Sequence, residues 1–349
     1  YCNCLRKDFQ VFYKILFQKI SAYDIIVSEN ILEVLIMSGE KVIFCGNNPD
    51  FLDKKLTTLS DGSNGGNAFR IPSLIRSGNT LIAAIDRQSC GADWGYIELA
   101  IRRSEDGGET WSDIQIIAIP PARKTMLSDE CYGSAFYIDP CMAIAPNGDV
   151  LLLVDFYPEC KGLHKRSILD KKKAPYALYD KEMRPTLYDR DVKFYVIDKS
   201  GHVLSHRYTD TGMTVDYESG ELYSGEAYLG NIHLNGKSPS NINEAGAKTT
   251  FGAPLKAPKR SYLYLLRSSD NGKTWSKPKD ITGQVLIKQD GTFLGVAPGV
   301  GLTTHKGRVI MPLYVDRKQT VSIYSIDDGE NWHRMAGHPY AENVVNLLR

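Results

Sequence analysis

Two arginines and two aspartates of this chain are of the types that could hold an anionic substrate and move a proton: Arg70, Arg87, Asp93 and Asp139. A guanidinium group binds a carboxylate through two parallel hydrogen bonds and does not lose its charge. An aspartate in a loop can act as a general acid or base within hydrogen-bond reach of a substrate. The residue types are therefore compatible with a binding site for a carboxylate in which Asp93 is the candidate acid/base group.

Each of these residues also has a structural interpretation. An arginine at the start of a strand is often paired with an aspartate across the sheet, and an aspartate before a strand often caps a turn. Asp86, which directly precedes Arg87, is interpreted as such a strand-end cap and is not included in the predicted site.

The elements that must position these residues are predicted to be short antiparallel strands. From Ala68 to Trp111, alternating apolar runs are interrupted by SGNT, RQSCGAD and SEDGG, which predicts four strands joined by turns. The same order recurs in two later units, one built from FYIDPCMAIAPNGDVLLLVDF and SYLYLLRSSDNGKTW, the other from VAPGVGLTTHKGRVIMPLYVD and TVSIYSIDDGENW. Repeated small antiparallel sheets predict an all-β fold, a β-propeller with about three full blades in this chain.

The up-and-down order of each unit sorts the residues by rim. The start of the first strand and the loop between the second and third strands lie at one end of a blade, and the two other turns lie at the opposite end. We therefore expect Arg70, Arg87, Asp93 and Asp139 on one rim.

The turns after each third strand share the pattern Ser-x-Asp-x-Gly-x-x-Trp, at Ser104 to Trp111, Ser268 to Trp275 and Ser325 to Trp332. Serine and aspartate can bond the backbone of the turn, glycine can take a positive φ, and tryptophan can fill the apolar gap between sheets. With these Asp boxes and the Phe69-Arg70-Ile71-Pro72 motif, the chain resembles the sialidase (neuraminidase) family, most closely the bacterial exo-α-sialidases. We expect the boxes to be structural and to lie on the rim opposite the site.

The resemblance implies a six-bladed propeller and assigns the candidate residues. Arg70 is similar to the first of three arginines that hold the carboxylate of sialic acid, and Asp93 matches the catalytic acid/base. Arg87 and Asp139 resemble the groups near the O4 hydroxyl of the sugar. The family removes terminal α-linked sialic acid from glycoproteins, glycolipids and oligosaccharides with retention of configuration, without a cofactor or metal, and is secreted or cell-surface bound in bacteria.

The nucleophile of the family, a tyrosine activated by a glutamate, and the other two arginines lie in the last three blades. Tyr132, Tyr137 and Tyr314 do not stand in the motif of that nucleophile. The sequence thus resembles the N-terminal half of the family's catalytic domain, so we expect the chain as written to lack sialoside hydrolysis. The alternatives are a noncatalytic sialoglycan-binding propeller and a structural, partner-binding propeller, and the charged residues of the motifs argue against both.

Composition excludes several classes of function. The formal net charge is +1 over 349 residues, without the basic excess typical of nucleic-acid-binding domains. No apolar run approaches the roughly 20 residues that span a bilayer, and no signal peptide is recognisable. The seven cysteines have scattered spacings that fit neither a disulfide framework nor a zinc site.

The predicted organisation has a leader over residues 1–40 without an assigned function and a sialidase-like propeller over residues 41–349. A helix over Asp8 to Ile20 and an irregular leader are equally compatible with the sequence. Residues 157–260 form an insert in the loop between the second and third strands of the second unit, on the same rim as the site. Its strand-like runs predict a small β-rich subdomain, and its basic run KGLHKRSILDKKK is either a solvated surface or a means of attracting acidic glycans.

Overall fold

The computed structural model describes residues 25–28, 41–45, 68–88, 93, 95–122, 134–159, 179–182, 184–235, 252–291, 293–315 and 319–335. The predicted helix over Asp8 to Ile20 lies outside these residues, as does Tyr132. Nearly every described element is a strand, and the strands form one two-stranded, one four-stranded, two five-stranded and one six-stranded sheet. Within the described part, no helix is long and apolar enough to cross a membrane.

Three sheets carry the repeat predicted from the sequence. The first has the order β3–β4–β5–β6, the second β16–β15–β8–β7–β18 and the third β17–β20–β21–β22, with β19 also paired to β20. Their bounds are β3 Ala68–Ser77, β4 Thr80–Gln88, β5 Ile97–Ser104, β6 Gln115–Ala118, β7 Phe136–Ile144, β8 Val150–Tyr157, β15 Tyr262–Ser268, β16 Lys279–Asp280, β17 Gly295–Val296, β18 Gly299–Val300, β19 Leu302–Thr303, β20 Val309–Val315, β21 Gln319–Ser325 and β22 His333–Arg334.

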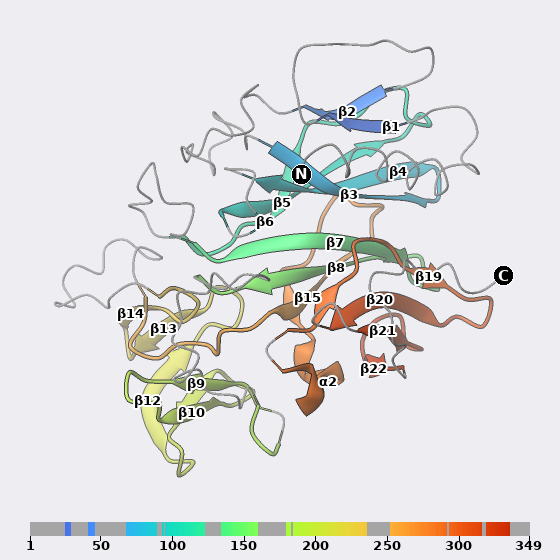
Figure 1. Cartoon of the computed structure of the whole chain (residues 1–349). Coiled ribbons are helices and arrows are strands. Elements are labelled where there is room, and N and C mark those ends of the chain that lie inside the picture. The colour runs from blue at the N-terminus through green and yellow to red at the C-terminus, as the bar shows by residue number, and fades with distance from the viewer. Residues whose placement is uncertain are drawn as a thin grey trace.

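These sheets follow one another along the molecule (Figure 1). Strand β18 comes from the segment that leads into the third sheet, yet it pairs in parallel with β7 of the second sheet. A short strand β2, Lys41–Cys45, matches the predicted KVIFC strand and pairs in parallel with β1, Ile25–Ser28.

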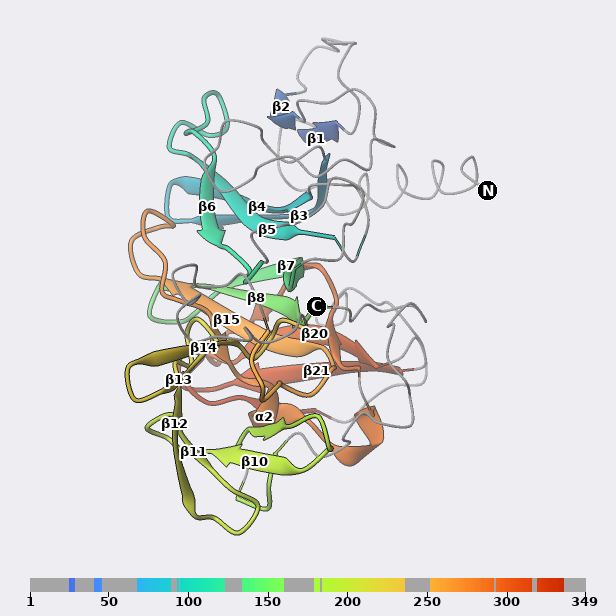
Figure 2. The same cartoon turned by 90° about the vertical axis from the view of Figure 1, so that its left-hand side faces the viewer.

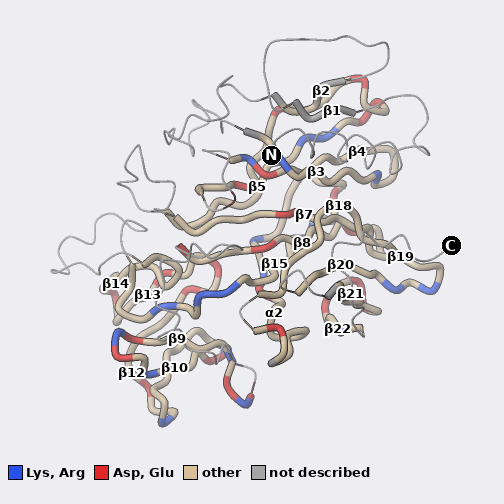
Figure 3. Tube along the Cα trace, viewed as in Figure 1, with Lys and Arg blue, Asp and Glu red and all other residues tan. Residues whose placement is uncertain are grey.

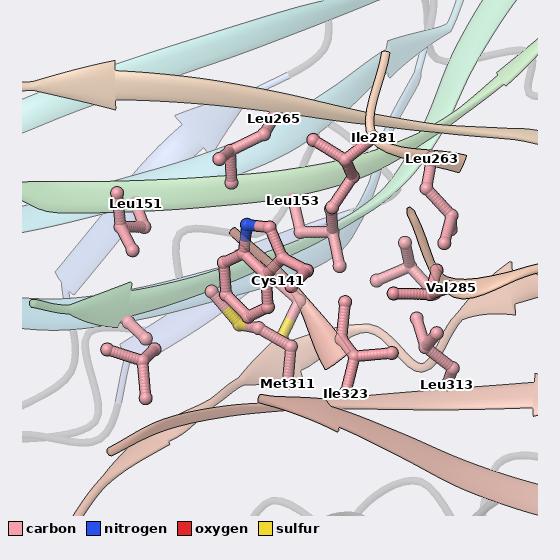
Figure 4. Packing of buried hydrophobic residues seen from close by; sticks show 14 of the residues in the cluster. Cys141, Leu151, Leu153, Leu263, Leu265, Ile281, Val285, Met311, Leu313 and Ile323 are labelled. Atoms are coloured by element: carbon pink, nitrogen blue, oxygen red, sulfur yellow. The ribbon is translucent and has the colours of Figure 1, made fainter. Parts of the chain in front are cut away.

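Apolar side chains fill the spaces between neighbouring sheets. The largest cluster joins β7, β8 and β15 to β20 and β21 and includes Cys141, Leu153, Leu263, Met311 and Ile323 (Figure 4). A second cluster joins the first sheet to the second. Because both faces of the second sheet are covered, its strand β8 is an uninterrupted buried run, VLLLVDFY.

The insert between β8 and β15 forms a sheet of its own, as its strand-like runs predict. Its strands pair in sequence order, all antiparallel, at the end of the molecule farthest from the first sheet (Figure 2). They are β9 Thr186–Tyr188, β10 Phe194–Ile197, β11 His202–Leu204, β12 Asp210–Val215, β13 Glu221–Ser224 and β14 Ala227–Asn231. Two short helices, α2 Thr282–Val285 and η2 Lys288–Asp290, follow β16.

The Asp boxes form the turns that their residue types predict. In the first box Ser104 Oγ donates to Asp106 and accepts from the N–H of Gly108, while Asp106 also accepts from the N–H of Thr110. The other two boxes repeat these bonds. Glycine is favoured in the third box for close packing as well as for its positive φ. A Cβ at Gly329 would stand 2.6 Å from Leu151 Cδ1 of the preceding sheet.

The boxes contact the hairpin turns of the preceding sheets. Ser77 Oγ, at the turn between β3 and β4, donates to Asn271 Oδ1 of the second box over 2.8 Å. The N–H of Asn147, in the turn between β7 and β8, donates to Asp328 Oδ1 of the third box over 3.1 Å. These turns end β3 and β7 at the opposite end from Arg70 and Asp139, so these boxes lie on the rim predicted for them.

His233 connects the insert to the second sheet and makes the stability of the fold pH-dependent. Its ring meets Phe156 edge-on, with centroids 4.8 Å apart, and burial lowers its pKa to about 3. The native state therefore binds fewer protons than the unfolded chain, so stability is lost as the pH falls below the ordinary histidine value. We expect this residue to remove about 1–3 kcal/mol of the free energy of unfolding between pH 6.5 and pH 4.

Urea unfolding of His233→Leu across that pH range measures this contribution, because leucine has no proton to bind. The matched control is His202→Leu, since His202 is 53% exposed. The prediction fails if His233→Leu keeps the full acid slope of the unaltered chain.

Candidate functional site

Arg70 and Asp93, predicted from the sequence to share a site, form an ion pair. Arg70 Nη1 donates to Asp93 Oδ1 over 2.5 Å, although β3 carries the arginine and the loop between β4 and β5 carries the aspartate. Their side chains are 27% and 44% exposed, respectively. A ligand can therefore reach both groups from solvent, and the guanidinium has further N–H donors to offer it.

A repeated backbone irregularity lies where Arg70 and Asp139 stand. The pairing of β3 with β4 shifts between Arg70 and Ser73, and that of β7 with β8 shifts between Ile138 and Cys141. Each bulge contains a left-handed residue before a proline, Ile71 at φ 57° and Asp139 at φ 66°. Bulges re-aim side chains at sheet ends. Asp139 thus occupies in the second sheet the position that Ile71 occupies in the first.

Asp86, interpreted from its sequence position as a strand-end cap, lies near Arg70, Asp93 and Asp139. Its carboxyl group is fully buried and accepts from the N–H of Asp139, at 3.2 Å to Oδ1 and 3.4 Å to Oδ2. Burial and the nearby Asp139 raise the pKa of Asp86, and Arg70 opposes the rise. Asp86 therefore caps a backbone N–H of the next sheet instead of its own turn. Its carboxyl group feels both the charge of Asp139 and the opposite charge of Arg70.

Asp155 repeats this arrangement one sheet further on. It is fully buried at the end of β8, and its Oδ1 accepts from the N–H of Val296 in β17 over 3.0 Å. Burial and the charge of Asp139 raise its pKa. The neighbouring Tyr157 and Tyr314 are nearly inaccessible to solvent and belong to one buried cluster. Acidic positions on β7 and β8 are visible in Figure 3.

Arg87 is not brought to the Arg70–Asp93 pair. Its Nη1 donates to Glu98 Oε2 over 2.9 Å, and Tyr96 donates to the other oxygen of that carboxylate over 2.9 Å. Arg87 and Glu98 are 5% and 1% exposed. Arg70 of β3 pairs with Asp86 of β4, so these two side chains share one face of the sheet. Because side chains alternate along a strand, the next residue, Arg87, lies on the opposite face. Its contact with a sugar stays a prediction.

Two signals in the sequence could have found the missed residues. The repeat places an aspartate at the end of the second strand in successive units, which are Asp86 and Asp155 in the described residues. Strand alternation links Tyr96 and Glu98, which are two residues apart and bonded to each other. Among the residues that the structure describes, no group of three histidine, cysteine or acidic side chains could hold a metal ion.

The comparison with known proteins agrees with this fold. A family model described as a BNR repeat-like domain matches residues 71–341. The chain is 28% identical over 304 residues to an anhydrosialidase of Macrobdella decora, covering 76% of this chain and 38% of that protein. It is 25% identical over 317 residues to sialidase B of Streptococcus pneumoniae, covering 80% and 43% respectively. The chain thus spans about two fifths of the length of these relatives.

Solved structures show the same fold. The NanB sialidase of Streptococcus pneumoniae superposes with a TM-score of 0.64 at 20% identity, over 83% of this chain and 47% of that one. An intramolecular trans-sialidase of Ruminococcus gnavus superposes with a TM-score of 0.61 at 24% identity, over 82% and 64%. The predicted all-β fold of the sialidase β-propeller type is confirmed, while the number of blades stays a prediction.

Proposed function

The chain belongs to the BNR repeat-like domain family, and from this premise we propose that it supplies the sialic-acid-binding and proton-donating side of an exo-α-sialidase. The observation that carries the proposal is the Arg70–Asp93 pair, a cation and a carboxyl group 2.5 Å apart at a solvent-accessible rim. Sialylated glycans are the proposed substrates, and a secreted or cell-surface location stays a prediction.

Arg70 is proposed to hold the carboxylate that sialic acid carries on its anomeric carbon. A guanidinium bound to that carboxylate keeps it in place while the ring moves toward an oxocarbenium-like transition state. Asp93, which lies within hydrogen-bond reach of Arg70, is proposed to carry a proton to the leaving oxygen.

Asp139 is proposed to accept a hydrogen bond from a ring hydroxyl of the sugar. The bond from its N–H to Asp86 and the following Pro140 restrict its backbone, which supports this proposal. A place for Arg87 near the same hydroxyl rests on the family resemblance alone, since its side chain is 5% exposed and is paired with Glu98.

Cleavage with retention needs a nucleophile on the far side of the anomeric carbon, for which sialidases use a tyrosine. A neutral phenol suits a substrate that carries its own carboxylate, because no like charges meet. We assign this role to none of the described tyrosines. Tyr137 and Tyr157 are buried, and burial raises the pKa of each.

Transfer to an internal hydroxyl is a second candidate, favoured by the likeness to the anhydrosialidase over 76% of this chain. Both reactions would share Arg70 and Asp93 and differ in what attacks the anomeric carbon in the second step. Water gives free sialic acid, whereas a hydroxyl of the sugar itself gives an anhydro product.

Proton NMR of the reaction with 3'-sialyllactose tests the function and separates the two candidates. An active protein that contains this chain is expected to release lactose and to form first either the α-anomer of sialic acid or an anhydro sugar. Release of the β-anomer first would contradict retention. Binding of sialic acid without cleavage, by a longer protein that contains this chain, would favour the noncatalytic sialoglycan-binding role, and absence of both would favour the structural one.

A further inference from the structure

The buried aspartate at the end of the second strand forms a connection between consecutive sheets. Asp86 Oδ1 accepts from the N–H of Asp139 in the second sheet, and Asp155 Oδ1 accepts from the N–H of Val296 in the third. Both aspartates are fully buried, and 53 and 141 residues separate them from their partners in sequence. A buried carboxyl group is costly unless it is bonded, so its recurrence points to a role.

The Asp86 connection reaches the proposed site directly. Arg70 and Asp86 are registered opposite each other on β3 and β4, so they share a face of the first sheet. Asp139 is held by Asp86 through its backbone while its own carboxylate belongs to the site. Asp86 therefore links the sheet that carries Arg70 to the bulge that carries Asp139 by a hydrogen bond.

We infer that Asp86 is a positioning residue: its buried carboxyl group fixes the left-handed bulge at Asp139 and so sets the distance between the Asp139 carboxylate and the Arg70–Asp93 pair. This inference rests on the proposed function for its effect on sugar binding. The bulge itself needs such support, because a non-glycine residue at positive φ costs energy that surrounding bonds must offset.

Two substitutions of Asp86 and one control substitution test this role. Asp86→Leu has a similar size but offers no acceptor, so the N–H of Asp139 loses its partner in a partly buried setting. Asp86→Asn keeps one acceptor oxygen and is the conservative rescue. Asp155→Leu is the matched control, since it removes the same kind of acceptor one sheet away.

The first measurement is amide hydrogen exchange of the 349-residue chain by NMR, which does not depend on any function. Asp86→Leu is expected to accelerate exchange at Asp139 about tenfold or more, a size typical of a lost buried hydrogen bond. Asp86→Asn should stay within about threefold of the unaltered chain. Asp155→Leu should accelerate exchange at Val296 and leave Asp139 protected. Unchanged exchange at Asp139 in Asp86→Leu would overturn the inference.

The second measurement is a double-mutant cycle on the affinity for 2,3-didehydro-N-acetylneuraminic acid. If Asp86 acts through Asp139, Asp86→Leu weakens binding about tenfold in the unaltered chain but less than about twofold in the Asp139→Ala background. Equal losses in both backgrounds would show that Asp86 acts on the fold in general and would overturn the positioning role.

The two measurements distinguish failure of the proposed function from failure of the positioning role of Asp86. If the unaltered chain does not bind the analogue, the proposed function is wrong, while hydrogen exchange still decides whether Asp86 holds the Asp139 bulge. If Asp86→Leu does not fold, Asp86→Ser replaces it, because the shorter side chain withdraws the acceptor with a smaller change of polarity. Complete exchange of the Asp139 amide on mixing, in the unaltered chain, would contradict the connection without any variant.

Discussion

Replacing Arg70 with alanine is expected to weaken binding of a sialic-acid analogue by about 100-fold or more. Truncating one partner of a buried, hydrogen-bonded charge pair, which Arg70 would form with a bound carboxylate, costs about 2–5 kcal/mol. A 100-fold loss of affinity corresponds to about 2.7 kcal/mol. The loss has two sources, because the substrate carboxylate loses its guanidinium and Asp93 loses its ion-pair partner. Isothermal titration of each purified variant measures it.

Two variants separate the shape of the guanidinium from its charge and from general effects. Arg70→Lys keeps the charge but not the two-pronged geometry and should recover part of the affinity. Arg76→Ala is the matched control on the same strand, since Arg76 bonds the carbonyl of Gly78 at the far end of β3. An Arg70→Ala chain that binds within threefold of the unaltered one would remove Arg70 from the site.

Replacing Asp93 with asparagine is expected to lower kcat by roughly 10²–10⁴-fold in an active protein that contains this chain. The substitution removes the proton donor and leaves the carboxylate-binding Arg70 in place, so affinity for the analogue should change little. The loss should be large for a sialoside with a poor leaving group, such as 3'-sialyllactose, and small for one with an activated phenol. Steady-state kinetics on both substrates measures the difference.

Asp113→Asn is the matched control for this substitution, because Asp113 is exposed in the loop between β5 and β6. It should leave both substrates unaffected. A loss below tenfold for Asp93→Asn with the poor leaving group, or equal losses with both, would contradict its role as the general acid.

The local chemistry of the turns was predictable, since it depends on residues close in sequence. Ser104, Asp106 and Gly108 lie within a single turn, and their bonds follow from side-chain types and a positive φ. The meeting of Arg70 with Asp93 was predictable because strand–turn–strand order returns the chain to the same rim. These inferences needed only the order of strands.

The face of the sheet on which Arg87 lies could not be predicted without the pairing register of β3 and β4. Its predicted rim position follows from turn order, but its face follows from which residue lies opposite Arg70, and a bulge at Ile71 shifts that pairing. The bonding partner of Asp86 could not be predicted for a related reason. A cap is normally expected to bond its own turn, whereas this one bonds a residue of the next sheet. Contacts between sheets depend on packing that no local pattern contains.

The most direct test of the account is calorimetric titration of the 349-residue chain with 2,3-didehydro-N-acetylneuraminic acid and with its primary amide. The two ligands differ only in the group that Arg70 is proposed to hold. The account predicts that the acid binds at least about 30-fold more tightly than the amide, and that Arg70→Ala removes this preference. Equal affinity of the unaltered chain for the acid and the amide would contradict the proposal that this site recognises sialic acid through its carboxylate.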